Sequence, residues 1–293
     1  MRLRTLATSL LAAIAGGAAA AQELQVIGQH ADAKMGWQPA ATELARDIHW
    51  LDNMLLVIIT VISLFVMALL LYCILRYNSR SNPQPASFTH NTPIEVAWTV
   101  IPIVILVFIG AFSLPVLFKQ QEIPEPEVFV KATGYQWYWG YEYPDQEIAF
   151  DSYMIGSDYG NHLTPEVSAA LAEAGYTDQQ FLLATDTAVV IPTGKTVVVQ
   201  TTGADVIHSW TIPAFGVKQD AVPGRLAELW FKVDEGMEGI YFGQCSELCG
   251  LSHAFMPITI KAVTQAEFDA WVSETKTAGR YVEPGSTRVA ASQ

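Results

Sequence analysis

The sequence is short of charge, and of positive charge in particular. Only 15% of its 293 residues are charged whereas 51% are hydrophobic, and 16 lysines and arginines stand against 29 aspartates and glutamates. So small a charged fraction is unusual for a soluble protein and predicts segments that lie in a membrane. The net charge of −13 argues against nucleic acid as a partner, because binding to phosphates needs basic surface. It favours a cationic partner instead.

Two stretches lack charged residues altogether. They cover residues 54–75 and 96–118, and each reaches the ~20 residues that a helix needs to cross a bilayer. Arg76 and Arg80 follow the first stretch, so the positive-inside rule places the loop at 76–95 in the cytoplasm. The segment at 22–53 and the chain after residue 118 are then expected outside the membrane, on the periplasmic side.

The first residues predict an export signal that agrees with this orientation. Arg2 and Arg4 give a basic start, an apolar stretch follows, and small residues precede Gln22. Such a stretch is too short to span a bilayer and ends in a pattern typical of cleavage. We expect removal of residues 1–21 as a signal peptide, and a retained anchor is the alternative.

Cysteine is scarce, and two of the three cysteines lie four residues apart. Cys73 is inside an apolar stretch and is expected to act as a small hydrophobic residue. Cys245 and Cys249 are followed closely by His253 and Met256. Thiolate, imidazole and thioether ligands suit copper rather than the hard cations that prefer oxygen. A disulfide in an oxidising compartment is the alternative, and zinc is disfavoured because methionine is not a usual zinc ligand.

Two bridging cysteines and two terminal histidines would hold a pair of copper ions, and His208 is the candidate for the second histidine. The run Gly243–Met256 closely resembles the copper-A loop of subunit II of haem-copper cytochrome c oxidases. The resemblance covers most of the chain, including the runs Gln136–Trp139 and Thr89–Glu95 and both apolar stretches. It implies a dinuclear copper site whose ligands are His208, Cys245, the Glu247 carbonyl, Cys249, His253 and Met256.

The resemblance also implies roles for single residues. The Glu247 carboxylate would contribute to a magnesium or manganese site shared with the catalytic subunit. Trp137 would receive the incoming electron, although alternation along a strand could simply bury both Trp137 and Trp139. Glu95 would stand at the entrance of a proton pathway, although a carboxylate at that position also suits the start of a helix.

The partners implied by the resemblance are the haem-bearing subunit I and subunit III in the bilayer, and cytochrome c as electron donor. A negative patch near the point where electrons enter would steer the lysine-rich edge of cytochrome c. The resemblance places this docking face at Glu142, Asp151, Asp186 and Asp205. Scattered carboxylates that only keep the surface soluble are the alternative.

The chain after residue 118 predicts a β domain. Runs rich in β-branched and aromatic residues alternate with turns, as in a sandwich or barrel, at 128–132, 188–192, 196–200 and 228–233. The resemblance sharpens this to a membrane-anchored all-β protein, in which a two-helix transmembrane hairpin precedes a cupredoxin-like Greek-key β-barrel. The barrel would cover 119–284, with a polar tail at 285–293. Thr164 and Thr264 predict helix starts, the first inside an insertion at 154–180.

The two apolar stretches lack histidine, so they hold no set of ligands for haem, and oxygen reduction must belong to a partner. The resemblance implies a subunit of a proton-pumping oxidase in the bacterial inner membrane, which passes electrons from cytochrome c to the haem and copper centre of subunit I. A quinol oxidase subunit would lack the copper ligands, and a nitrous-oxide reductase would need a further catalytic domain. A membrane-anchored copper chaperone would show a thioredoxin-like βαβ pattern.

Overall fold

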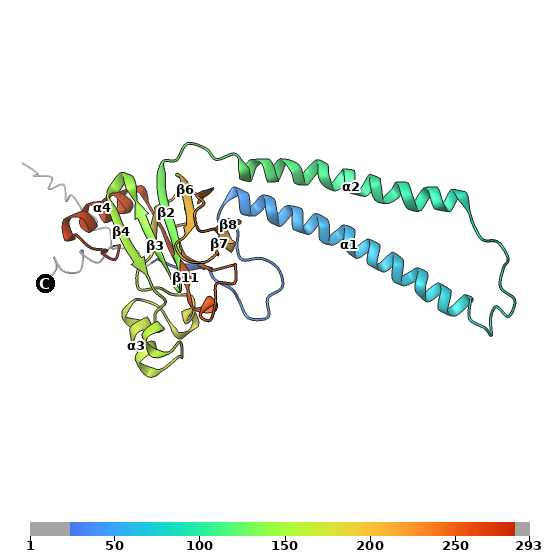
Figure 1. Ribbon diagram of the computed structural model, residues 1–293, viewed down its shortest axis with the longest axis horizontal. Helices are drawn as coiled ribbons and strands as arrows, with labels where there is room; N and C mark the ends of the chain where they lie inside the picture. The colour runs from blue at the N-terminus through green and yellow to red at the C-terminus, as the bar shows by residue number, and fades with distance from the viewer. Residues whose placement is uncertain (1–23, 285–293) are drawn as a thin grey trace, which may run out of the picture.

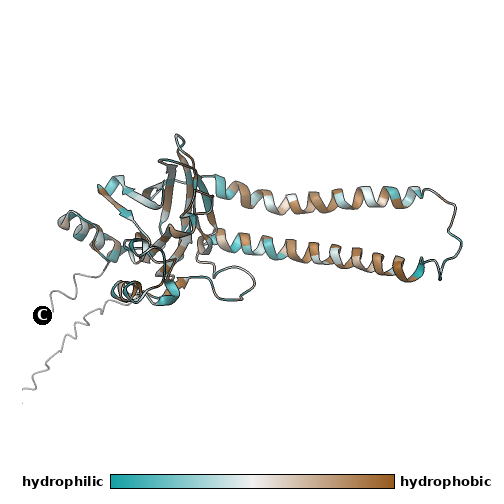
Figure 2. Cartoon of the chain, turned by 60° about the horizontal axis from the view of Figure 1, so that its bottom comes forward, coloured by the Kyte–Doolittle hydropathy of each residue, from teal (hydrophilic) through white to brown (hydrophobic). Residues whose placement is uncertain are grey.

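The computed structural model describes residues 24–284, which form a long two-helix hairpin joined to a β domain (Figure 1). The predicted signal peptide and the predicted polar tail lie outside the described residues. Helix α1 spans Glu43–Arg76 and helix α2 spans Thr92–Gln121. Both are long and apolar enough to cross a membrane, and hydrophobic residues run along most of their length (Figure 2). Each of the two uncharged stretches lies inside one of these helices.

Helix α1 begins before its uncharged stretch because its first turns belong to the β domain. The Thr42 side chain caps the helix by accepting from the Ala45 amide at 3.0 Å, and Leu44 and Ala45 are buried. Gly216 makes this contact possible, because a Cβ there would lie 2.7 Å from the Ala45 Cα atom. The end of α2 is fixed to the same turns, where Lys119 pairs with carboxylates of α1. The hairpin is therefore docked on the β domain and not merely tethered to it.

The β domain consists of two sheets and a hairpin, which confirms the predicted β architecture after the helices. The five-stranded sheet has the order β4 (Ile148–Ser152), β3 (Tyr138–Tyr143), β2 (Val128–Tyr135), β6 (Thr196–Gly203), β9 (Ala227–Lys232). The four-stranded sheet has the order β1 (Val26–Gly28), β10 (Gly239–Gln244), β11 (Pro257–Val263), β5 (Val189–Pro192). The hairpin consists of β7 (His208–Ile212) and β8 (Val217–Ala221).

Helices and short turns complete the domain. Helix α3 spans Pro165–Glu173 and helix α4 spans Gln265–Ala278. Thr164 and Thr264 cap them, as predicted. Single 3₁₀ turns occur at Pro144–Gln146, Ser157–Tyr159, Asp178–Gln180, Pro213–Phe215 and His253–Phe255.

The buried side chains form two separate cores. The main core fills the space between the two sheets, and alternate residues of β2, among them Val128, Val130 and Ala132, point into it. A smaller core joins α3 to the outer side of β10, through Val167, Leu171 and Phe242 among others. The segment between β10 and β11, residues 245–256, contributes Cys245, Cys249 and Met256 to the main core and carries every candidate ligand except His208, which lies on β7.

Candidate metal centre

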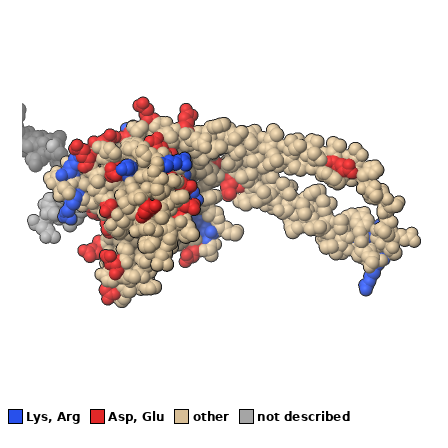
Figure 3. Space-filling view, viewed as in Figure 1, with Lys and Arg blue, Asp and Glu red and all other residues tan. Residues whose placement is uncertain are grey.

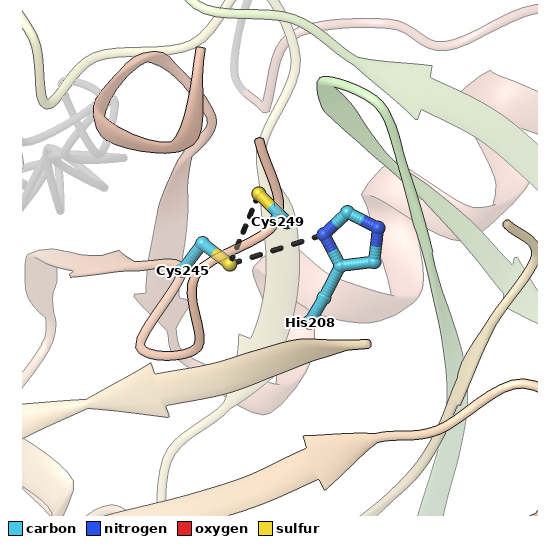
Figure 4. Close-up of side chains that lie close together, drawn as sticks. All are labelled: His208, Cys245 and Cys249. Carbon is cyan, nitrogen blue, oxygen red and sulfur yellow. Dashed lines mark hydrogen bonds between the residues drawn. The ribbon is translucent and has the colours of Figure 1, made fainter. Parts of the chain in front are cut away.

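Three parts of the chain bring the candidate ligands together. His208 opens β7, Cys245 follows β10 directly, and Met256 directly precedes β11. The Cys245 sulfur lies 3.9 Å from the Cys249 sulfur and 3.9 Å from the His208 Nδ1 atom (Figure 4). A disulfide bond measures about 2.05 Å, so both cysteines are free thiols here and the disulfide alternative is not what the structure contains.

The remaining ligands approach the same two sulfur atoms. The Cys249 sulfur lies 3.5 Å from the His253 Nδ1 atom and 3.4 Å from the Met256 sulfur. The Glu247 carbonyl oxygen lies 3.3 Å from the Cys245 sulfur, while the residue as a whole is exposed. The structure therefore gathers all six predicted ligands around a central pair of sulfurs, with one imidazole beside each sulfur.

His208 is held from three sides. Its Nε2 atom lies 2.9 Å from the Asp205 carboxylate, which leaves Nδ1 facing Cys245. A carboxylate on the outer nitrogen fixes the orientation of a ligating histidine and raises its basicity. Trp139 meets the imidazole edge to face, with ring centroids 5.9 Å apart. Gly134 closes the third side, because a Cβ there would lie 2.7 Å from the ring.

The loop backbone is held by the turn between β2 and β3. The Cys249 carbonyl accepts from the Trp137 indole nitrogen at 3.2 Å and from the Gln136 side-chain amide at 2.8 Å. The Trp139 indole nitrogen donates to the Met256 carbonyl at 3.3 Å. On the opposite side of the loop, the Ser246 amide donates to the Ser209 carbonyl at 2.9 Å. Both ends of the loop are therefore fixed by neighbouring strands, and its middle is fixed by the turn between β2 and β3.

The two tryptophans do not share an environment. Trp139 lies in β3 and is fully buried, whereas Trp137 lies in the turn before β3 and is only partly buried. The alternative that strand alternation buries both is therefore wrong, because Trp137 is outside the strand. Its indole lies against the metal loop, where a Cβ on Gly250 would be 3.2 Å from its ring. Trp137 thus connects the surface to the backbone of a ligand.

The thiols of the pair differ in acidity. Burial opposes ionisation of Cys245, but hydrogen bonds from His208 and from the loop outweigh it and bring the pKa of Cys245 down to about 7. Burial and the adjacent charge of Cys245 raise the pKa of Cys249 to about 12. Burial also opposes the charged form of His208, yet its bonds to Cys245 and Asp205 leave its pKa raised. Two thiolates this close require nearby cations, and bound metal ions deprotonate coordinating thiols. The residues therefore fit a soft metal centre.

All four predicted docking acids are exposed, with Glu142 on β3, Asp151 on β4, and Asp186 and Asp205 in loops. Asp151 stands opposite Gly140 on the neighbouring strand. The Asp186 carboxylate accepts from the Tyr153 amide at 2.8 Å. Glu142 is paired with Lys131 at 2.7 Å, which the sequence did not reveal. Asp205 also contacts His208, which the sequence did not predict. The one signal for this contact was the position of Asp205 three residues before the histidine.

Glu95 lies at the opposite end of the molecule from the metal loop, in the first turn of α2 (Figure 1). It is partly buried, and its carboxylate accepts from the Asn91 amide at 3.1 Å. Glu95 therefore stabilises the start of helix α2, which is the simpler of the two roles predicted for it.

Comparison with known proteins identifies relatives over most of the chain. The family described as cytochrome C oxidase subunit II, periplasmic domain, matches residues 128–263, and the transmembrane domain of the same subunit matches residues 30–116. Cytochrome c oxidase subunit 2 of Cereibacter sphaeroides is 62% identical over 273 residues, which cover 92% of this chain and 89% of that protein. The probable cytochrome c oxidase subunit 2 of Rickettsia bellii is 46% identical over 241 residues, covering 82% and 83%.

A crystal structure of the periplasmic domain of subunit II of cytochrome oxidase from Bradyrhizobium japonicum is 45% identical in sequence. It covers 53% of this chain and 98% of that one, with a TM-score of 0.43.

Proposed function

Because the chain belongs to the cytochrome c oxidase subunit II family, we propose that its loop between β10 and β11 holds the copper pair that receives electrons from cytochrome c. Members of this family carry copper, belong to a respiratory oxidoreductase complex, and are anchored in the membrane with a periplasmic domain. The observation that carries the proposal is the arrangement of donors, with two thiols 3.9 Å apart and an imidazole nitrogen beside each.

When bound, a copper pair supplies a centre that gains and loses one electron at a time. The residues of this chain hold it in place and keep it largely dry. The ligands are His208, Cys245, the Glu247 carbonyl, Cys249, His253 and Met256. Four of these side chains are buried, and neighbouring strands fix the loop backbone on both sides. Ligands that cannot shift between oxidation states allow fast transfer, because little rearrangement accompanies the change in charge.

Trp137 is the residue through which electrons reach the loop. Its partly exposed indole donates to the carbonyl of Cys249, so one hydrogen bond separates the surface from a ligand. Glu142, Asp151, Asp186 and Asp205 form the docking face for cytochrome c. Electrostatic complementarity at such a face mainly raises the rate of encounter and fixes orientation.

The exposed Glu247 side chain is available for a hard cation, magnesium or manganese, shared with subunit I. Carboxylate oxygen is the ligand that these ions prefer. The same subunit I, with its haem, is the acceptor of the electrons, and subunit III completes the membrane assembly. Residues 1–21 are removed on export.

Glu95 serves proton uptake at the cytoplasmic mouth of the hairpin. Its cap on Asn91 does not require a charge, because a glutamine oxygen can accept the same bond. Glu95→Gln should therefore leave helix α2 intact while slowing turnover of the complex. Unchanged turnover would reduce Glu95 to its capping role.

Metal analysis and electron paramagnetic resonance on the purified full-length chain test the central proposal. Two coppers per chain with a seven-line hyperfine pattern are expected, because one unpaired electron would be shared by two copper nuclei. A four-line spectrum with one copper would favour the alternative, a membrane-anchored copper chaperone. A chain that binds no copper while its two thiols are reduced would contradict both.

A further inference from the structure

The insertion and the strands beside it form a continuous region without positive charge. No lysine or arginine occurs between Lys131 and Lys195, whereas nine aspartates and glutamates do, and all nine are exposed. Among the described residues, only Glu142 of these nine has an ion-pair partner. Figure 3 shows acidic and no basic side chains over the part of the domain where α3 lies. The region therefore presents uncompensated negative charge.

This region contains a hollow of about 530 Å³ between α3 and the segment at 153–159. Two tyrosines and three carboxylates stand among its walls, contributed by Tyr153, Asp158, Tyr159, Glu173 and Asp186. The wall formed by α3 is fixed, because Thr164 caps the helix and Val167 and Leu171 are fully buried in the smaller core. The hollow is a feature of the folded insertion and not a gap between mobile loops.

A row of aromatic rings leads from the hollow towards Trp137. The ring of Tyr153 stacks on Tyr138 with centroids 4.4 Å apart, and Tyr138 stacks on Tyr135 at 4.7 Å. Tyr138 is the residue next to Trp137 in the chain. A protein that docks over Trp137 therefore lies beside this row, and the hollow is at its far end.

We propose that the hollow receives a lysine or arginine side chain of the cytochrome c that docks over Trp137, so that the insertion extends the docking face. This inference rests on the proposed function and adds to it a specific receptor on the insertion. An ammonium or guanidinium group is attracted both to the face of a tyrosine ring and to carboxylates. The hollow offers both kinds of group together.

Charge selects this occupant over the others. A second copy of this chain carries the same net charge of −13 and would be repelled. An apolar ligand would leave three carboxylates beside it without water or a counter-ion, which is costly. Although the residue as a whole is exposed, local burial of the carboxylate raises the pKa of Asp186, and the neighbouring Asp151 adds a smaller contribution. A cation placed there relieves this crowding of like charges.

The test is the double variant Asp158→Asn with Glu173→Gln in the intact oxidase complex. With a soluble lysine-rich cytochrome c at low ionic strength, KM should rise about threefold to tenfold and its salt dependence should flatten, while kcat stays the same. Turnover with a small uncharged reductant should not change. The matched control is Glu122→Gln with Glu125→Gln, which removes the same charge from the exposed linker after α2. An unchanged KM in the first variant, or an equal rise in the control, would overturn the proposal.

A second measurement does not depend on substitution. A carbodiimide joins a carboxylate to a lysine amine as an amide with loss of water, so it records which carboxylates touch a lysine of the bound cytochrome. Cross-linked peptides should include Asp158 or Glu173, and cross-links confined to other acids would contradict the proposal.

The docking face outside the hollow is tested in parallel by Glu142→Gln with Asp151→Asn. A rise in KM there, with none for Asp158→Asn and Glu173→Gln, would leave the proposed function standing and refute only the inference about the insertion. No effect in either variant would refute both.

Discussion

The metal loop and the insertion at 154–180 are both excursions from the same β domain, yet they are attached to it in different ways. Cys245, Cys249 and Met256 belong to the main core between the two sheets. The insertion has a core of its own, built around Val167 and Leu171, which meets the outer side of β10. One excursion is continuous with the packing of the domain, whereas the other is added to its surface.

This difference in packing suits the function proposed for each region. A metal pair that transfers electrons needs ligands in fixed positions, and the loop obtains them from hydrogen bonds to β7 and to the turn before β3. Docking of a partner needs charge and shape at the surface, and tolerates small movements. The comparison predicts that substitutions in the metal loop affect electron transfer and metal binding together with packing. Substitutions in the insertion should affect only the encounter with cytochrome c.

The largest effect on electron transfer is expected at Trp137, which lies between the protein surface and the metal loop. Trp137→Phe keeps an aromatic ring but removes the indole nitrogen that donates to the Cys249 carbonyl. Oxidation of cytochrome c by the complex should slow by about tenfold or more, because small displacements in a transfer pathway are costly. Copper content should be retained, since Gln136 still bonds the same carbonyl. Steady-state turnover and copper analysis check this, and a rate equal to that of the unaltered complex would remove Trp137 from the pathway.

A smaller effect on electron transfer is expected at Asp205, which contacts the outer nitrogen of the ligand His208. Asp205→Asn weakens the partner of His208, and loss of such an outer contact typically lowers metal affinity by about 10–100-fold. Competition for copper with a chelator measures this. Asp151→Asn is the matched control, because it removes the same charge from a residue outside the metal site. Equal copper affinity in both variants would mean that Asp205 acts only at the docking face.

Local patterns in the sequence were enough to predict much of this arrangement. The uncharged stretches, the caps at Thr164 and Thr264 and the run of Cys245, Cys249, His253 and Met256 are each defined by neighbours within a few positions, and the structure contains both helices and both caps where they were expected. It also places the six ligands together. The resemblance supplied the pairing of His208 with the distant loop, which no local pattern could give.

Contacts between distant segments could not be predicted in the same way. Val26–Gly28 joins the sheet beside β10, although nothing in those three residues indicates a partner more than two hundred positions away. The stacking of Tyr153 on Tyr138 depends on the register of β3 and β4, which alternation alone does not fix. The bond between Asp205 and His208 required knowledge of which way the imidazole points.

The smallest effect on function is expected from Leu171→Ala, within the insertion. Leu171 is fully buried in the smaller core, and truncation of such a leucine costs about 2–5 kcal/mol, depending on how far the site collapses. Amide exchange should accelerate across α3 and its flanking turns, and KM for cytochrome c should rise as the wall of the hollow loosens.

The copper spectrum should stay the same, even though Phe242 of β10 belongs to the smaller core and lies three residues before Cys245. Six consecutive residue pairs hold β10 to β11 and should stop the disturbance there. Ile260→Ala, an equally buried truncation in β11, should instead disturb the metal loop. A changed copper spectrum in Leu171→Ala would show that the two regions are coupled through β10, and that the insertion contributes to the metal site as well as to docking.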